Sequence, residues 1–345
     1  MNSSTADPES AAPQAKETAP HQRRPRYAGK NPRRFEDKYK ELNPERYAAD
    51  VAKVLALQPG EHAVDCTLGF GGHARELLAR ITPGGRLIGL DVDPIELPKT
   101  TARLRSAGWG EEVFTAVRAN FAALPRVLAE LGLDGVDAVL ADLGVSSMQL
   151  DDPVRGFTFK ADCPLDLRMN PSRPPSAADW LARVSTADLA SALTGNSDEP
   201  YAEVLARELT ARRSKTPFTR TRQLAETIRA ILRRNDPRHD PETDDDCVRR
   251  VFQAIRIAVN DEFGVLNLFL RQLPSCLKAG GRVAILTFHS GEDRRVKQAF
   301  REGLRAGNYS AVNEEVVRAG PEERRANPRS SPAKLRWAIQ AGSAR

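Results

Sequence analysis

The sequence feature that most constrains the fold is a regular alternation of short apolar runs and helical segments between residues 62 and 147. The apolar runs read HAVDC, GRLIGLD, EVFTAVR and VDAVLAD, and segments with helical periodicity lie between them. Strands that alternate with helices are typical of a parallel sheet that carries helices on both faces. A later apolar run, GGRVAILTFHS, predicts a further strand of the same sheet. We therefore predict an α/β fold with a doubly wound, mostly parallel sheet.

The alternation stops after Asp152, and residues from about 175 to 270 read as helices with polar breaks. At 345 residues, the chain has room for one large domain with an insertion. We therefore predict that residues 44–150 and 246–345 form one α/β domain, and that residues 151–245 form a helical domain inserted into it.

The two ends of the chain differ in composition from the part between them. Residues 1–43 are first rich in Ser, Ala, Pro and Glu, which predicts disorder, and then become basic with interspersed aromatic residues. This basic extension is either a solvated tail or an arm that contacts nucleic acid through phosphates and bases. We further expect a short helix over Pro44–Leu57 and, near the end, a polar basic loop followed by an edge strand over Leu335–Ile339.

Composition and charge exclude several classes of protein. Lys and Arg exceed Asp and Glu by 52 to 46, which is a mild bias toward polyanionic partners. The four cysteines lie far apart without C-x-x-C spacing, so we expect neither a metal site nor a disulfide framework, as in a reducing compartment. No apolar run approaches the roughly 18 residues that span a membrane, and no apolar signal core stands at the start. These features predict a cytoplasmic protein without a metal or a membrane partner.

Glycines and polar residues gather where successive predicted strands end. Gly69, Gly71 and Gly72 fall in the first strand-to-helix turn, where a backbone without Cβ atoms lets a ligand approach closely. Asp91 ends the second strand, where an acid can accept both ribose hydroxyls of an adenosine, and Phe121 follows the third strand. This pattern indicates an adenosine-containing cofactor, and a tight turn with a helix-capping acid is the alternative.

The identity of the cofactor depends on what surrounds the glycine turn. The dinucleotide fingerprint G-x-G-x-x-G needs a third glycine that GFGGHA lacks, and its helix N-terminus faces a pyrophosphate. Here Asp65 stands shortly before the turn. A carboxylate repels a pyrophosphate but attracts an amino group or a sulfonium. The turn therefore favours S-adenosyl-L-methionine over NAD.

The fourth predicted strand ends on Asp142, and small polar residues follow it. In a methyltransferase with such a sheet, this carboxylate lies near the acceptor, where it can accept an N–H of an aromatic amine and take the proton after transfer. Ser146 and Ser147 leave room for a flat base, and Gln149 offers both a donor and an acceptor. The alternative is that Asp142 caps the turn that follows the strand.

Seven segments of the chain, in order, resemble the bacterial family of small-subunit (16S) ribosomal RNA cytosine N4-methyltransferases. They run from about residue 60 onward and read VDCTLGFGGHA, LADLGVSSMQLDDPVRGFTF, CPLDLRMNP, TRTRQLAE, RVFQAIRIAVNDE, GGRVAILTFHSGEDRRVK and NPRSSPAKLR. The resemblance implies a Rossmann-like methyltransferase fold with a helical insertion, S-adenosyl-L-methionine as cofactor, and N4-methylation of a decoding-centre cytidine of 16S ribosomal RNA. The implied partner is that RNA or the small ribosomal subunit, and a homodimer remains open. The chain departs from the family pattern before the first strand, where it has no His-x-Pro-Val segment.

The resemblance also implies roles for individual residues. Against the cofactor it places Gly71, Gly72, His73, Asp91, Phe121, Asp142 and Gln149. The catalytic candidates are Asp142, His289 and Asn260, and the substrate-side candidates are Ser146, Ser147, Asp166, Arg168 and Arg256. Asp142 thus has two competing roles, as a cofactor contact and as the proton acceptor. The alternative for Arg168 and Arg256 is an ion pair with a neighbouring acid, and the alternative for His289 is a structural hydrogen bond.

Other functions fit the sequence less well. Methylation of a ring carbon uses a cysteine nucleophile, and no cysteine follows a proline in a catalytic-looking loop. DNA amino-methyltransferases carry an Asp/Asn-Pro-Pro-aromatic motif, and DLGV lacks both prolines. The alternative that stays open is an RNA-binding ribosome-assembly factor with weakened or lost methyltransferase activity, since the family's His-x-Pro-Val segment is missing.

Overall fold

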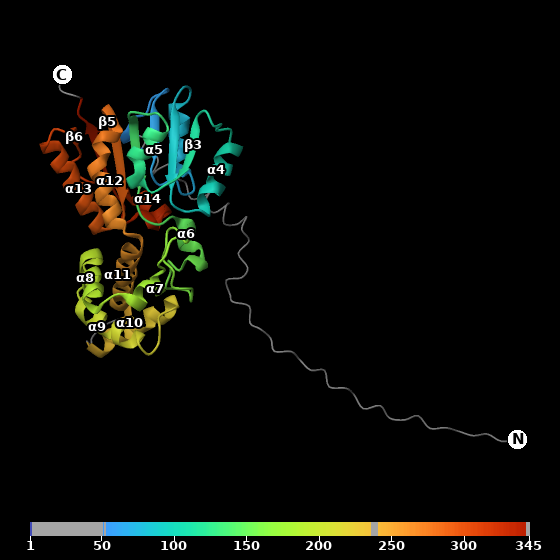
Figure 1. Cartoon of the computed structure of the whole chain (residues 1–345), viewed down its shortest axis with the longest axis vertical. Coiled ribbons are helices and arrows are strands. Elements are labelled where there is room, and N and C mark those ends of the chain that lie inside the picture. The colour runs from blue at the N-terminus through green and yellow to red at the C-terminus, as the bar shows by residue number, and fades with distance from the viewer. Residues whose placement is uncertain (2–50, 52, 236–240, 343–345) are drawn as a thin grey trace. The chain divides into compact units, whose positions relative to one another are not determined.

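The structure is a computed structural model that describes residue 1, residue 51 and residues 53–235 and 241–342 (Figure 1). The basic extension lies outside these residues, as does most of the helix expected over Pro44–Leu57, of which residues 51 and 53–55 are helical. The described residues from 51 onward group into one unit by their internal contacts.

A mixed sheet forms the centre of this unit, with the strand order β3-β2-β1-β4-β5-β8-β6 and with β7 paired to β8. The strands are β1 (His62–Asp65), β2 (Arg86–Asp91), β3 (Phe114–Arg118), β4 (Val136–Asp142), β5 (Leu277–Thr287), β6 (Tyr309–Val312), β7 (Val317–Arg318) and β8 (Lys334–Gln340). The strands from β3 to β5 are parallel, whereas β8 is antiparallel to β5, β6 and β7. The predicted α/β class with a mostly parallel sheet is confirmed.

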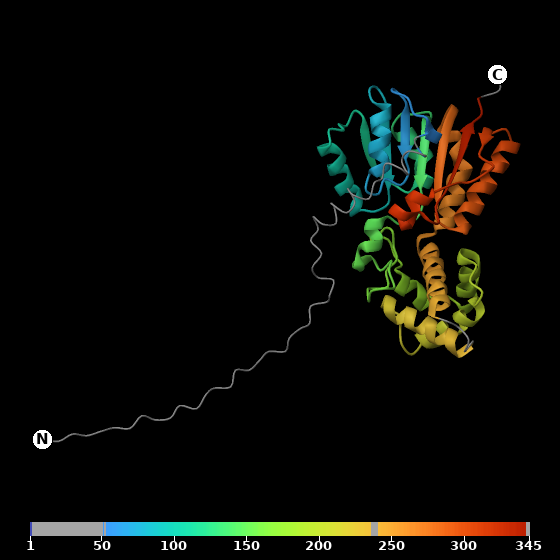
Figure 2. The same cartoon turned by 180° about the vertical axis from the view of Figure 1, so that it is seen from behind.

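Helices cover both faces of the sheet because alternate strand residues point to opposite sides. One face packs against α5 (Leu124–Glu130), α12 (Glu262–Cys276) and α13 (Ser290–Arg305), and the other against α3 (Gly72–Ile81) and α4 (Glu96–Ser106). On β4, Val139 and Ala141 belong to the first apolar cluster, and Ala138 and Leu140 belong to the second. Figure 1 shows α5 and α12 in front of the sheet, and Figure 2 shows the opposite face. No helix in the described ranges is both long and apolar enough to cross a membrane.

The residues between β4 and α12 build a separate helical layer. Its elements are α6 (Ser147–Asp151), η2 (Pro153–Arg155), α7 (Ala177–Arg183), α8 (Thr186–Ser197), α9 (Ala202–Arg213), α10 (Thr221–Asn235) and α11 (Pro241–Asn260). Helices α7 to α11 bury an apolar cluster of their own, which includes Leu189, Leu205 and Ile228. The predicted boundary between residues 245 and 246 falls inside α11, whose residues as far as Ile255 pack in this cluster. The division of the chain into domains stays a prediction.

The last strand lies where the sequence did not place it. The prediction of an edge strand over Leu335–Ile339 was wrong, because β8 lies inside the sheet between β5 and β6. The short helices α14 (Pro321–Ala326) and η3 (Pro328–Ser330) precede it, within the segment expected to be a loop. In the middle of β8, the buried Arg336 donates from Nε to Asp293 Oδ1 at 2.6 Å. The charge of Arg336 on this interior strand is therefore paired inside the protein.

Candidate active site

Three acids that end strands lie at the same edge of the sheet. Asp65, Asp91 and Asp142 end β1, β2 and β4, which are neighbours in the order β2-β1-β4. Because these strands are parallel, their carboxyl ends open on one side, where such folds bind ligands. Thr67 ties two of the ends together, since its hydroxyl accepts from Asp142 N at 2.7 Å and its N–H donates to Asp65 Oδ1 at 3.1 Å. Three carboxylates therefore lie side by side at the carboxyl ends of adjacent strands.

Two of these carboxylates keep an oxygen that has no hydrogen-bond partner among the described residues. Asp65 is 1% exposed, and its Oδ2 accepts no hydrogen bond; Asp142 Oδ1 is likewise buried and unpaired. Burial raises the pKa of Asp65 to about 6, although the nearby His73 acts against the rise. Buried acceptors are normally satisfied. These two oxygens therefore keep hydrogen-bonding capacity that no described residue satisfies.

The glycine turn between β1 and α3 is held against the second strand. Gly69 and Gly71 have φ angles of +47° and +84°, which a residue with a Cβ rarely adopts. Gly71 is the N-cap of α3, and a Cβ there would lie 2.9 Å from Thr100 Cγ2. Gly69 N donates to Asp91 Oδ2 at 2.8 Å. Glycine is therefore required in this turn by the backbone and its packing, before any ligand is considered.

His73 pairs with Asp142 across the turn. Helix α3 begins at Gly72, and Nε2 of the following His73 lies 3.5 Å from Asp142 Oδ2. Burial lowers the pKa of His73, but the hydrogen bond and charge of Asp142 outweigh burial and raise it overall. The Asp142 side chain is 32% exposed. Asp142 is therefore oriented by His73 through one oxygen and reachable by a ligand.

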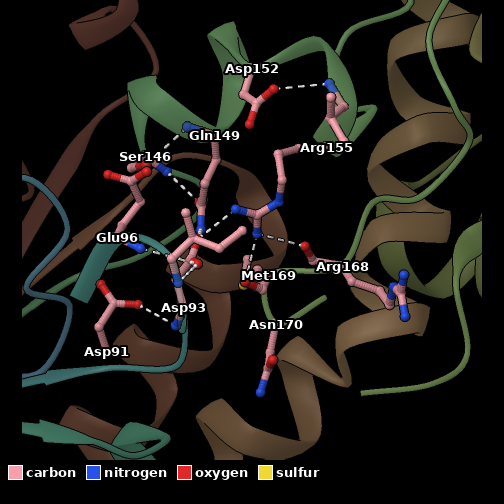
Figure 3. Close-up of polar contacts among 12 residues, drawn as sticks. Asp91, Asp93, Glu96, Ser146, Gln149, Asp152, Arg155, Arg168, Met169 and Asn170 are labelled. Atoms are coloured by element: carbon pink, nitrogen blue, oxygen red, sulfur yellow. Dashed lines mark hydrogen bonds and ion pairs between the residues drawn. The ribbon is translucent and has the colours of Figure 1, made fainter. Parts of the chain in front are cut away.

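A buried network continues from the second strand toward the insertion (Figure 3). Asp93 N donates to Asp91 Oδ1 at 2.9 Å, and Asp93 Oδ2 accepts from Gln149 Nε2 at 2.9 Å and from Arg155 Nη1 at 2.6 Å. Arg155 Nη2 also donates to two main-chain oxygens of residues 166–170, at 3.0 and 2.7 Å. Burial alone would raise the pKa of Asp93, yet hydrogen bonds from Gln149 and Arg155 hold it below its ordinary value. Asp93 and Arg155 were not predicted from the sequence, because the two stand 62 residues apart and no local pattern pairs them.

Gln149 is engaged by the protein at both ends of its amide. Ser146 Oγ accepts from Gln149 N at 3.2 Å, and Gln149 Oε1 accepts from Ser146 N at 2.9 Å, which forms a capping box at the start of α6. Its Nε2 contacts Asp93, as described above. Ser147 is the first residue of α6. The predicted contacts of these residues with cofactor or substrate stay predictions.

The two arginines assigned to the substrate side form the ion pairs that were their alternative. Arg168 donates to Asp166 from Nε at 2.9 Å and from Nη2 at 2.6 Å. Arg256 donates to both carboxylate oxygens of Glu262, at 2.8 and 3.0 Å. The hydrogen bond with Asp166 raises the pKa of Arg168. Asp166 and Arg168 are partly exposed and can still meet a ligand, whereas Arg256 is more enclosed.

The remaining catalytic candidates lie beside the end of β5 and the end of α11. His289 Nε2 lies 3.2 Å from Glu292 Oε1, and the other oxygen of Glu292 accepts from Phe288 N at 2.8 Å. Asn260 Oδ1 accepts from Met169 N at 2.7 Å, and its Nδ2 donates to Leu167 O at 2.8 Å. Both groups of the Asn260 amide therefore contact main chain, and the catalytic role of Asn260 stays a prediction.

Among the described residues, Glu262, His289 and Glu292 bring ligand-type atoms close enough to share a metal ion. Both oxygens of Glu262 already accept from Arg256, whose positive charge opposes a second cation at this place. The set is better explained as an ion-pair network.

Phe121 packs against α12, with its ring centroid 5.1 Å from that of Phe269 in an edge-to-face arrangement.

The sequence of this chain is similar to the sequences of known methylases. The sequence model described as the MraW methylase family matches residues 47–341, a range that includes the stretch before β1. The chain is 45% identical to Ribosomal RNA small subunit methyltransferase H 1 of Lachnoclostridium phytofermentans, over 93% of this chain and 93% of that protein. It is 40% identical to Ribosomal RNA small subunit methyltransferase H of Chromobacterium violaceum, over 84% of this chain and 92% of that protein.

Solved structures are more distant. A putative rRNA methylase from Clostridium thermocellum superposes with a TM-score of 0.42 at 11% identity, covering 87% of this chain and 97% of that one. Fibrillarin of Aeropyrum pernix, solved with S-adenosyl-L-methionine, gives a TM-score of 0.38 at 11% identity over 87% of this chain and 76% of that one.

Proposed function

This chain belongs to the MraW methylase family, and from that premise we propose that it methylates N4 of a cytidine in the decoding centre of 16S ribosomal RNA. The predicted family resemblance and the predicted cofactor, S-adenosyl-L-methionine, are confirmed. The relatives are named for the RNA of the small ribosomal subunit, which supports that RNA, or the subunit itself, as the partner. We also propose that the methylated nucleotide is a cytidine and the methylated atom its N4. The proposal further includes a cytoplasmic location and a homodimer.

The observation that carries the proposal is the pair of unpaired carboxylate oxygens beside the glycine turn. Asp65 and Asp142 supply them from adjacent strands, and Gly71 shapes the turn between. S-adenosyl-L-methionine supplies a methyl group on a positively charged sulfur, which these carboxylates suit. In the proposal, Gly71, Gly72, His73, Asp91 and Phe121 complete the cofactor contacts, with Asp91 accepting from the ribose. Gln149 supports the cofactor contacts indirectly, because it donates to Asp93, which in turn donates to Asp91.

Asp142 is also the residue that we propose receives the proton. The exocyclic amine of cytosine is a poor nucleophile because its lone pair is delocalised into the ring. A carboxylate that accepts one N–H localises that lone pair and takes the proton as the N–C bond forms. His73 Nε2 lies 3.5 Å from Asp142 Oδ2, and the Asp142 side chain is 32% exposed, so a substrate can reach the carboxylate for this role. A single carboxylate can thus contact the cofactor and serve the amine.

The other candidates act on the substrate side in this proposal. Ser146 and Ser147 border the space beyond β4, and Asp166 with Arg168 presents a partly exposed pair to the RNA. His289, oriented by Glu292, contacts the base. Arg256 and Asn260 act as positioning residues, since their polar groups contact Glu262 and the main chain of residues 167–169.

The test is methyl transfer to small ribosomal subunits that lack the modification. With labelled S-adenosyl-L-methionine, digestion to nucleosides and mass spectrometry should find N4-methylcytidine. We expect Asp142→Ala to lower the rate about 10²- to 10⁴-fold, the usual effect of removing an acid–base group. The matched control is Asp137→Asn, which alters an acid at the other end of β4 that accepts from His62 N and Lys278 Nζ. Label on another atom would refute the N4 assignment.

The second candidate function, an RNA-binding assembly factor without turnover, makes a different prediction for cofactor binding. Calorimetric titration with S-adenosyl-L-methionine should show micromolar binding, about −8 kcal/mol, if the cofactor site is intact. An assembly factor would bind small subunits but would show neither this binding nor methyl transfer. The unpaired oxygens of Asp65 and Asp142 favour the enzyme.

A further inference from the structure

Residues 166–170 are clamped through their main chain by two side chains. Leu167 has a φ of +59°, a conformation that a side chain disfavours and that surrounding contacts must hold. Asn260 contacts Leu167 O and Met169 N at 2.8 and 2.7 Å. Arg155 Nη2 contacts the main-chain oxygens of Arg168 and Met169 at 3.0 and 2.7 Å, and Arg155 O accepts from Leu167 N at 3.1 Å. The clamp fixes the segment that presents the Asp166–Arg168 pair.

The other arm of Arg155 leads back to the cofactor edge. Arg155 Nη1 contacts Asp93 Oδ2 at 2.6 Å, Asp93 N contacts Asp91 Oδ1 at 2.9 Å, and Asp91 Oδ2 accepts from Gly69 N at 2.8 Å. Figure 3 shows the guanidinium between Asp93 and the carbonyls of the clamped segment. An unbroken series of hydrogen bonds therefore joins the glycine turn to residues 166–170. Each oxygen of Asp91 accepts one N–H in this series and keeps capacity for a ribose hydroxyl.

Both members of the central pair are enclosed. Arg155 is 4% exposed and Asp93 is 0% exposed. A buried ion pair is costly to desolvate and persists only where its geometry is well satisfied. The planar guanidinium meets a carboxylate and two carbonyls at once, which a lysine ammonium cannot reproduce with the same fixed fork. The site therefore depends on arginine itself and not only on positive charge.

We propose that Arg155 is a positioning residue that couples the cofactor edge to the substrate segment, so that occupation of the Asp91 edge tightens residues 166–170. The inference rests on the proposed function for its substrate side. Coupling between two sites is reciprocal, so RNA binding at the Asp166–Arg168 pair strengthens cofactor binding by the same factor. Arg155 contacts neither ligand in this scheme.

The contacts predict an asymmetric loss when Arg155 is changed. Without its guanidinium, Asp93 still accepts from Gln149 Nε2 and, through Oδ1, from Ile95 N. The carbonyls of Arg168 and Met169 lose the donor that the described structure gives them. Arg155→Lys should therefore leave the cofactor edge nearly intact and loosen the substrate segment.

The first experiment is hydrogen exchange of the peptide that covers residues 166–170, with and without S-adenosyl-L-homocysteine. In the unchanged chain we expect the ligand to slow exchange at least about fivefold, a typical coupling. In Arg155→Lys the ligand should bind within about twofold of the same affinity and no longer slow exchange. The matched control is Arg229→Lys, which alters an arginine of the insertion paired with Asp245. Equal slowing in Arg155→Lys, or no slowing in the unchanged chain, would overturn the proposal.

The second experiment measures kcat and KM separately for each substrate. The enzyme concentration used for kcat counts only the molecules that bind S-adenosyl-L-homocysteine, so that misfolded protein does not lower it. We expect Arg155→Lys to lower kcat/KM for small ribosomal subunits about tenfold, with KM for S-adenosyl-L-methionine little changed. A purely structural role would lower the thermal midpoint and leave both constants unchanged, which would contradict the coupling. If Arg155→Lys does not fold, Asp93→Asn/Arg155→Gln removes both buried charges together and takes its place. The exchange experiment contains no RNA, so its outcome does not depend on whether the N4 assignment is correct.

Discussion

Asp65 and Asp93 are two buried acids at the carboxyl ends of paired strands, and the protein treats them in opposite ways. Asp65 ends β1, is 1% exposed and leaves Oδ2 without a partner among the described residues. Asp93 follows β2, is 0% exposed and accepts from Ile95 N, Gln149 Nε2 and Arg155 Nη1. Burial raises the pKa of Asp65 to about 6, whereas the hydrogen bonds of Gln149 and Arg155 outweigh burial and lower the pKa of Asp93.

The difference is between a buried carboxylate with an unmet acceptor and a buried carboxylate whose acceptors the protein satisfies. A buried carboxylate without enough donors costs stability, and it is retained where a ligand supplies the missing donors. A buried carboxylate with a full set of donors adds rigidity, because removing any one partner leaves an unmet group. The same isosteric substitution should therefore have opposite effects at the two positions.

The largest expected effect is at the satisfied acid. Asp93→Asn leaves the charge of the buried Arg155 without its counter-ion, which typically costs about 3–5 kcal/mol. Urea unfolding followed by far-UV circular dichroism should show this loss as a lower free energy of unfolding. Adding Arg155→Gln should recover most of it, since no buried charge then remains. A loss below about 1 kcal/mol would mean that the pair is not an enclosed ion pair.

The unsatisfied acid should respond with a gain. A pKa raised from 3.8 to about 6 corresponds to about 3 kcal/mol of cost for the ionised form at pH 7. Asp65→Asn removes that cost, so the ligand-free protein should become more stable by up to about 3 kcal/mol. The same variant should bind S-adenosyl-L-homocysteine about ten- to a hundredfold more weakly, as when a hydrogen bond to a charged group is lost. Calorimetry gives the affinity for S-adenosyl-L-homocysteine, and urea unfolding of the same preparation gives the free energy of unfolding. If Asp65→Asn is less stable than the unchanged chain, Asp65 does not carry an unmet cost of burial.

The free energy of unfolding should depend on pH in opposite directions for Asp65 and Asp93, with a smaller effect than the substitutions above. The unfolded chain releases the Asp65 proton near pH 3.8 and the folded chain near pH 6, so the free energy of unfolding falls as pH rises between these values. The advantage of Asp65→Asn should therefore shrink to about 1.5 kcal/mol at pH 5 and vanish near pH 3. Asp93, whose pKa is lowered, contributes stability that is lost only as pH falls below about 4. An advantage of Asp65→Asn that does not vary with pH would show that its ionisation is not the cause.

The smallest effect is expected where an ion pair is solvated. Arg126 and Glu130 on α5 pair at 2.6 Å, and both side chains are exposed. Arg126→Met should change the free energy of unfolding by less than about 0.5 kcal/mol, because water competes for both charges. The loss of stability in Arg126→Met, compared with that in Asp93→Asn, shows how much an ion pair contributes when it is not buried. A loss comparable to that of Asp93→Asn would remove burial as the explanation.

Much of the fold is visible in the sequence because β1 to β5 are apolar runs that follow the parallel-sheet pattern. The interior place of β8 is not visible, because Lys334 and Arg336 give the strand the polar alternation of an edge. Only the three-dimensional structure shows that Asp293 accepts from both of them, at 3.1 and 2.6 Å. Buried charges of this kind mislead any interpretation that equates charge with exposure.

Candidate residues could be named from the sequence where a polar side chain ends a strand, and not where distant residues meet. Asp142 and Asp91 could be named because each ends an apolar run. Arg155 could not, since its contacts are Asp93 and carbonyl groups, and carbonyls carry no sequence signal. Gln149 was named as a candidate, and its role stays a prediction, but its contact with Asp93 was not predicted.

The place of β8 also fixes the order in which this sheet can be finished during synthesis. β8 is the last of the described strands to leave the ribosome, yet it fills the gap between β5 and β6, and β6 pairs with no other described strand. A nascent chain that stops before Lys334 can assemble the parallel strands and the insertion, but it carries the open edge of β5 throughout. Open edges pair with whatever strand is near. Pairing of β8 is therefore the step that covers this edge, and newly made copies are most prone to aggregate before it.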